Sequence, residues 1–195
     1  MGNKITNKLV VSLADSCAGP KLTEHILQLL YRQEAAATRQ LVALCIGSDR
    51  YTGDSLGPLV GSYLEENTGI TVYGSLDHPV HAGNLVEIIR LIHTRYSQPL
   101  IVAVDACLGK SHEVGNIEAW EGGIEAGIAV GNRLPCVGHI SLIGVVNAGG
   151  QLGYLDLQST PLSIVMKLSK VIGASLSEAA RGRALLDAAA FSRRF

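Results

Sequence analysis

Three uninterrupted apolar runs constrain the fold of this chain more than any other feature. They span residues 41–47, 100–105 and 140–147, and a shorter run at 70–74 lies between the first two. Strands that are covered on both faces, as in a parallel sheet, are apolar throughout, whereas half-exposed strands alternate between apolar and polar residues. The runs therefore predict interior parallel strands of one sheet.

Amphipathic segments separate these runs. In residues 84–96 the apolar side chains recur at helical spacing, with Leu85, Ile88 and Ile92 on one stripe, which is typical of a helix that covers a sheet face. Further helices are predicted at 21–33, 162–172 and 177–195. Strands that alternate with helices indicate the α/β class, here a three-layer fold with a mainly parallel twisted sheet flanked by helices.

The chain has 195 residues, a length typical of one domain. We predict a single α/β hydrolase-like domain with a helical N-terminal wrap (1–40), a core (41–175) and a C-terminal helix (176–195). Residues 108–135 interrupt the regular alternation. Because this segment is rich in glycine and contains Trp120, the only tryptophan, it is predicted to be a hairpin or a loop insertion.

Composition excludes several function classes. Charged residues are 17% of the chain and the formal net charge is -1, so no surface for direct nucleic-acid binding is expected. No run reaches the about 18 apolar residues of a membrane span. The four cysteines lie far apart without a CxxC pair, which argues against a zinc knuckle or a redox dithiol. We therefore expect a protein of the reducing cytoplasm.

Acidic side chains follow the predicted strands. Asp49 and Asp54 come after the first strand, Asp77 after the second, and Asp105 closes the third. In an open α/β sheet, ligands bind at the carboxyl ends of the strands. These acids are therefore expected at one edge, together with His78, His81 and Asn147. His139 precedes residues 140–147 and is expected at the opposite edge.

Each acid also has a structural interpretation. Asp54 precedes an apolar helical pattern and could cap that helix, and Asp49 could form a surface ion pair with Arg50. Asp105 is harder to explain structurally, because an ionised group at the end of an apolar strand loses hydration and must be paired or neutralised.

Known motifs for other chemistries are missing. The sequence contains neither GxGxxG nor GxxxxGK[ST], and it has no GxSxG nucleophile elbow, so nucleotide binding and serine catalysis are disfavoured. Two carboxylates in a poorly hydrated cleft can share one proton, so that one activates water while the other protonates a leaving group. The same acids with a histidine could instead hold nickel, zinc or manganese.

Four ordered segments carry a family resemblance. CIGSDRYTGDSLGPLVGSYL, YGSLDHPVHAGNLVEII, IVAVDACLG and IAVGNRLPCVGHISLIGVVNAGG resemble the YyaC family of spore protease-like sporulation proteins, over about residues 41–170. That family is similar, more distantly, to the spore germination endopeptidase, which degrades small acid-soluble spore proteins, and to hydrogenase maturation endopeptidases. The resemblance implies a phosphorylase/hydrolase-like α/β fold.

The resemblance also implies roles for two acids. The germination protease is attributed an aspartic mechanism whose two acids match Asp54, in TGDSLGP, and Asp105, in AVDAC. In the hydrogenase maturation enzymes, two acids and a histidine bind nickel. Asp54 stands where that family usually has glutamate, Asp105 matches the second acid, and the histidine segment has no clear match here. The metal version is therefore not favoured.

These inferences define the expected function. We expect an endopeptidase of sporulation or germination that hydrolyses a peptide or a small spore protein with Asp54 and Asp105, without a cofactor, in the cytoplasm of a sporulating cell or forespore. Homo-oligomer formation is left open. The alternatives are a non-catalytic spore peptide-binding protein on a protease fold and a metal-dependent maturation protease. The residues expected to bind substrate are Asp49, Asp77, His78, His81 and Asn147.

Overall fold

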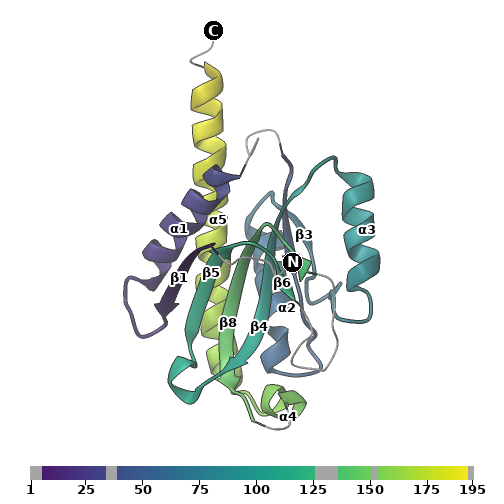
Figure 1. Ribbon diagram of the computed structural model, residues 1–195, viewed down its shortest axis with the longest axis vertical. Coiled ribbons are helices and arrows are strands. Elements are labelled where there is room, and N and C mark those ends of the chain that lie inside the picture. The colour runs from purple at the N-terminus through teal and green to yellow at the C-terminus, as the bar shows by residue number, and fades with distance from the viewer. Residues whose placement is uncertain (1–5, 34–38, 126–135, 151–152, 193–195) are drawn as a thin grey trace.

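The computed structural model describes residues 6–33, 39–125, 136–150 and 153–192, and these form three layers with a sheet between helices (Figure 1). Six strands make the sheet in the spatial order β1-β5-β8-β4-β2-β3. Their bounds are β1 Thr6–Ser12, β2 Leu41–Cys45, β3 Thr71–Tyr73, β4 Leu100–Gly109, β5 Asn116–Glu121 and β8 Ile140–Ala148. A separate two-stranded ribbon pairs β6 (Ile124–Glu125) with β7 (Cys136–Val137).

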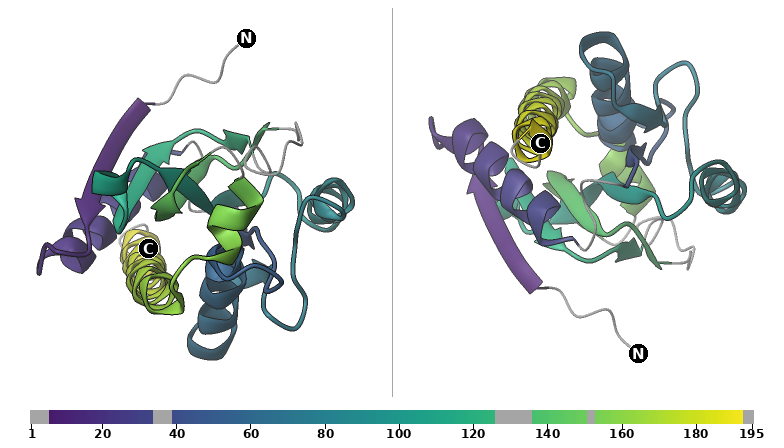
Figure 2. Two further views of the ribbon diagram at one scale, coloured as in Figure 1. Left: turned by 90° about the horizontal axis from the view of Figure 1, so that it is seen from below. Right: turned by 90° about the horizontal axis from the view of Figure 1, so that it is seen from above.

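The helices are α1 Ala18–Arg32, α2 Leu56–Asn67, α3 Leu85–Arg95, α4 Gly153–Gln158 and α5 Leu162–Ser192, with short 3-10 turns η2 (Gly53–Ser55) and η3 (Ser111–Glu113). Helices α1, α2 and α5 pack on one face of the sheet, where strand residues such as Val102 and Val104 meet Leu22 and Leu168. Helix α3 covers part of the other face, where Leu44 and Ile101 join the same apolar cluster as Ile92. Figure 2 shows α3 standing apart from the other three long helices.

The prediction of a mainly parallel sheet is confirmed. Strands β8, β4, β2 and β3 pair in parallel, while β5 is antiparallel to both β8 and β1. The first five residues of β4 are all buried, which explains the unbroken apolar run at 100–105. A strand with neighbours on both sides and helices or loops over both faces has no position for a polar residue until it reaches the edge of the sheet.

The two ends of the chain differ from the prediction. Residues 6–12 of the expected helical wrap form β1, an edge strand, in which Val11 is buried and Val10 is exposed. The helices expected at 162–172 and 177–195 are the single helix α5. Ser177, the first residue of the last expected helix, is instead buried in the interior of α5. Gly173 does not break this helix, because the missing side chain lets α5 approach the ring of Tyr63 on α2.

The segment 108–135 is more regular than the prediction of a hairpin or loop insertion. It contains the end of β4, then η3, β5 and β6, and residues 126–135 lie outside the described part. Strand β5 pairs with β8 and β1 rather than with the preceding β4. It is therefore a strand of the main sheet, formed through a long-range contact that local turn residues do not reveal.

Candidate functional site

A cavity of about 240 Å³ opens at the carboxyl edge of the sheet. Three segments supply its walls: the loop and turn after β2, the loop after β3 and the second half of β4. The lining residues are Ile46, Gly47, Ser48, Arg50, Tyr51, Asp54, His81, Ala82, Gly83 and Asp105. The structure thus brings Asp54 and Asp105 to one cavity, at the edge where the strand-end rule predicted them.

Backbone hydrogen bonds hold the turn that carries Asp54. The N–H of Ile46 donates to the Val104 carbonyl (2.7 Å), and that of Gly47 donates to the Val80 carbonyl (2.7 Å). Ser48 N–H then donates to the Asp54 carbonyl (3.1 Å). Gly47 has φ +143°, which a side chain would strain. The glycine therefore lets the chain leave β2 and fold back so that Asp54 faces the edge of the sheet.

Asp54 is not used for helix capping. It lies within η2, between Thr52 and Ser55, which are the N-cap residues of η2 and α2. Neither of these N-termini has a side-chain capping hydrogen bond. The half-buried carboxylate instead lines the cavity, and the capping interpretation is wrong.

Burial controls the protonation of Asp54. Loss of hydration raises the pKa of its carboxyl group, whereas a hydrogen bond from the Ser48 backbone and the nearby His81 act in the opposite direction. These two contacts favour the ionised carboxylate, so Asp54 is the more readily ionised member of the pair.

Asp105 is more strongly perturbed. It follows five buried residues of β4, and its Oδ1 accepts the N–H of Ala106 at 2.7 Å. Burial raises the pKa of this carboxyl group well above its usual range, and the negative charge of Asp54 raises it further. Because two neighbouring carboxylates in a poorly hydrated site resist double ionisation, Asp105 is the member that keeps a proton.

His81 joins the acids from the loop after β3. The ring Nδ1 of His81 accepts a hydrogen bond from the backbone N–H of Gly83 (3.1 Å). The backbone N–H of His81 donates to Oδ1 of Asn84 (2.8 Å). Asn84 in turn donates to the Pro79 carbonyl (3.0 Å), which closes the loop. Since Nδ1 is an acceptor, the neutral ring carries its proton on Nε2. His81 is therefore arranged as a hydrogen-bond donor rather than as a base.

Four predicted substrate-binding residues are not among those lining the cavity. Asp49, Asp77 and His78 are exposed, because each follows a strand at a turn that directs it to solvent. Asn147 is used structurally: its Nδ2 donates to the Asp156 carbonyl (2.9 Å) and its Oδ1 accepts the Ala148 N–H (2.9 Å), so it holds α4 on the end of β8. Of the five, only His81 lines the cavity.

Sequence reasoning missed the three other lining residues that have polar side chains, Ser48, Arg50 and Tyr51. Arg50 was considered as an ion-pair partner of Asp49, but the ion pairs found among the described residues do not include this one. Their position in the sequence was a partial signal, since all three residues lie between the end of the first strand and Asp54. The direction of each side chain depends on the turn, which residue types alone do not specify.

His139 lies at the opposite edge, as predicted. Its Nδ1 accepts the N–H of Ile101, near the start of β4 (3.1 Å), and Arg39 Nη2 lies 2.8 Å from its Nε2. Burial lowers the pKa of His139, and the charge of Arg39 lowers it further.

Within the described residues no three His, Cys, Asp or Glu side chains are grouped as a metal ion would require. Asp54, Asp105 and His81 line one cavity without forming such a group.

The raised pKa of Asp105 has a consequence for stability. A carboxyl group whose folded pKa is raised favours the folded state fully only below its unfolded pKa, and this contribution is lost as the pH rises through the folded value. Asp105→Asn cannot ionise and can keep the acceptor for Ala106. We expect the variant and the wild type to be equally stable at about pH 3, below the ordinary pKa of an aspartate, and the variant to be the more stable at about pH 8. Urea unfolding at both pH values measures this; a pH-independent difference would contradict it.

Comparison with known proteins supports this fold. The solved structure of the NiFe hydrogenase maturation protease HycI from Thermococcus kodakarensis KOD1 is similar, with a TM-score of 0.54 at 16% sequence identity, over 80% of this chain and 98% of that one. At this identity the similarity concerns the fold alone.

Among the described residues, no helix has the length and apolarity to span a membrane.

Sequence comparison identifies the family. The uncharacterized protein YyaC of Bacillus subtilis (strain 168) is 41% identical over 172 residues, which cover 87% of this chain and 82% of that protein. This similarity confirms the resemblance inferred from the four segments. The family described as protein of unknown function (DUF1256) matches residues 15–175. The chain therefore belongs to the DUF1256 family.

Proposed function

We propose that the chain is a peptidase that hydrolyses peptide bonds with the carboxyl pair Asp54 and Asp105. The observation that carries the proposal is that both side chains line one cavity and that the charge of Asp54 raises the pKa of Asp105. Perturbed carboxyl groups that interact within a cleft are typical of acid–base catalysis. The protease fold of the HycI structure adds support by analogy.

The surroundings of the two acids assign their roles. Asp54 is the general base, because the Ser48 backbone and His81 favour its ionised form. Asp105 is the general acid, because burial and the Asp54 charge favour its protonated form. Its Oδ1 is occupied by Ala106 N–H, so Oδ2 is the oxygen available to carry the proton. The donor at His81 Nε2 can orient the carbonyl oxygen of the substrate.

Peptide hydrolysis then follows with balanced protons. Asp54 removes one proton from a water molecule as the water oxygen attacks the carbonyl carbon. Asp105 gives its proton to the leaving nitrogen as the C–N bond breaks, and the water oxygen stays in the new carboxyl group. The proton held by Asp54 restores the acid form of Asp105, so the pair ends with the single proton with which it began.

The resemblance to spore protease-like proteins suggests the setting. We place the substrate among peptides and small spore proteins, and the activity in the cytoplasm of a sporulating cell or forespore. A non-catalytic peptide-binding protein is the competing proposal. Such a protein would bind the same substrates as the peptidase but would not cleave them, and this difference can be measured.

The pH dependence of hydrolysis tests the proposal. Activity requires Asp54 ionised and Asp105 protonated, so kcat/KM should rise as the first group loses its proton and fall as the second does. The plot of kcat/KM against pH should therefore be bell-shaped. Because burial raises both pKa values, its rising and falling sides should both lie above about pH 4, the ordinary range of a carboxyl group.

The assay follows cleavage of purified small acid-soluble spore proteins from pH 4 to 9, with EDTA and with added nickel as parallel arms. A bell-shaped profile that neither arm changes supports the carboxyl pair. Binding without cleavage at every pH would contradict the peptidase proposal and favour a peptide-binding protein. Activity that depends on nickel would favour a metal-dependent protease.

A further inference from the structure

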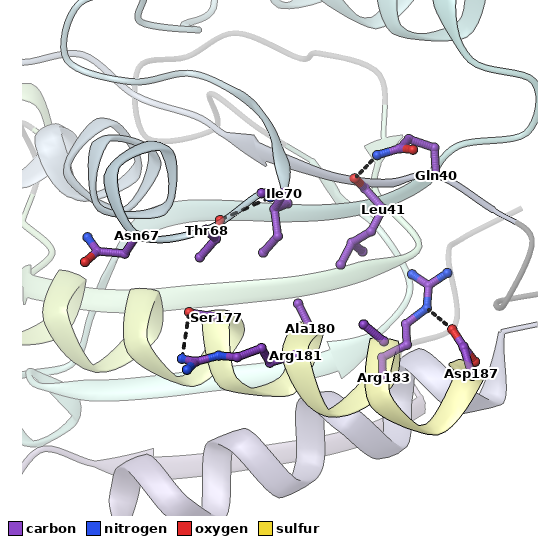
Figure 3. Close-up of a pocket in the computed structure, with 12 residues that line it drawn as sticks. Gln40, Leu41, Asn67, Thr68, Ile70, Ser177, Ala180, Arg181, Arg183 and Asp187 are labelled. Atoms are coloured by element: carbon purple, nitrogen blue, oxygen red, sulfur yellow. Dashed lines mark hydrogen bonds and ion pairs between the residues drawn. The ribbon is translucent and has the colours of Figure 1, made fainter. Parts of the chain in front are cut away.

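A second and larger hollow lies at the opposite edge of the sheet. This groove, of about 540 Å³, runs between α5 and the amino ends of β2 and β3 (Figure 3). Its volume is within the range of small-molecule sites. The lining residues are Gln40, Leu41, Asn67, Thr68, Gly69, Ile70, Ser177, Ala180, Arg181, Arg183, Ala184 and Asp187. None of them lines the acid cavity, so the groove is a separate candidate site.

One part of the groove is lined by apolar or small side chains, beside the polar ones. Leu41 and Ile70 point from the sheet edge toward α5, and Ala180 faces them from the helix (Figure 3). Ala184 lies one turn further along α5. Alanines at this spacing leave the space between helix and sheet open, where longer side chains would close it. The middle of the groove therefore suits an aliphatic chain.

The charged residues of the groove carry an excess of positive charge. Arg183 is buried, its Nε lies 3.6 Å from Oδ2 of Asp187, and its Nη2 donates to the Arg39 carbonyl at 2.9 Å. Burial lowers the pKa of the nearby Arg39 guanidinium, and the charge of Arg183 lowers it further. Of the residues that line the groove, Arg181 and Arg183 are cationic and Asp187 is anionic, although the whole chain has a net charge of -1.

Arg181 is the group that can receive a ligand. It is exposed and lies along α5, where its Nη2 donates to Ser177 Oγ at the long distance of 3.5 Å (Figure 3). The ion pairs of the described residues do not include Arg181, whereas Arg183 is matched by Asp187. One unneutralised guanidinium beside an apolar groove is complementary to a ligand with one negative charge and an apolar body.

We propose that this groove binds an aliphatic carboxylate, with the carboxylate at Arg181 and the hydrocarbon between Leu41, Ile70 and the alanines of α5. A carboxylate matches the single unpaired guanidinium better than a doubly charged phosphate ester does. The site lies at the other end of the strands from Asp54 and Asp105, so its occupancy is independent of the peptidase proposal.

Calorimetry with hexanoate tests the site. A ligand of this size should bind at one site with a Kd of about 1 mM. Acetate, which has no chain, and hexylammonium, which has the opposite charge, should bind at least about tenfold more weakly. Arg181→Gln should weaken hexanoate binding about tenfold by removing a charged hydrogen bond. Ala184→Trp should abolish binding by filling the groove.

Arg90→Gln is the matched control, because it makes the same chemical change at an exposed position of α3. Arg181 and Ala184 are also exposed, so unchanged melting temperatures should show that all three variants fold. The proposal is overturned if hexanoate shows no saturable binding, if hexylammonium binds as well as hexanoate, or if Arg181→Gln binds hexanoate like the wild type.

Discussion

Replacing Asp54 or Asp105 by asparagine is expected to lower kcat for peptide hydrolysis by about 10²–10⁴-fold. Asparagine keeps the size of the side chain but can neither take a proton from water nor give one to the leaving nitrogen. Both groups line the cavity and neither caps a helix, so the loss should be in kcat rather than in folding. Steady-state kinetics on a spore-protein substrate, with circular dichroism of each variant, measures the effect.

The two acids should also behave as one unit. If they share a proton, the double variant should be scarcely less active than either single variant, because removing one member already disables the step. Asp49→Asn and Asp77→Asn are matched controls, since both residues are exposed and outside the cavity. Full activity in either Asp54→Asn or Asp105→Asn, or equal losses in the controls, would contradict the paired mechanism.

Gly57→Ala is expected to destabilise the protein by about 3 kcal/mol or more. Gly57 is the second residue of α2, where a Cβ atom would overlap the carbonyl oxygen of Ile46 and come within 2.7 Å of its carbonyl carbon. The obstacle is backbone at the end of β2, held by hydrogen bonds to β4 and to the loop after β3. It cannot move without displacing the turn that carries Asp54. Chemical denaturation gives the free energy of unfolding.

Gly19→Ala provides the matched comparison. Gly19 is the second residue of α1, and nothing lies within 4 Å of a Cβ atom built there. The same substitution should therefore stabilise the protein by about 0.5–1 kcal/mol, because alanine favours the helix more than glycine does. If the two variants shift stability by similar amounts, the close approach of α2 to β2 does not limit stability in solution.

Much of this architecture follows from local pattern. The three unbroken apolar runs are β2, β4 and β8, and the helical spacing of residues 84–96 corresponds to α3. Strand β1 and the continuity of α5 were missed for one reason. A short edge strand has only one apolar face, and whether a helix continues past Gly173 depends on the ring of Tyr63 packed against it. Both decisions rest on contacts between residues distant in the sequence.

For the candidate site, the sequence alone determined that Asp54 and Asp105 belong at the carboxyl edge, because an apolar strand can place a carboxylate only where it ends. Only the tertiary structure decided which neighbours share that edge. It kept His81 of the five predicted neighbours, added Ser48 and Tyr51 to the cavity, left Asp49, Asp77 and His78 exposed and used Asn147 to hold α4. The periodicity of a strand specifies where its end lies, whereas the direction of a loop side chain depends on hydrogen bonds to segments far along the chain.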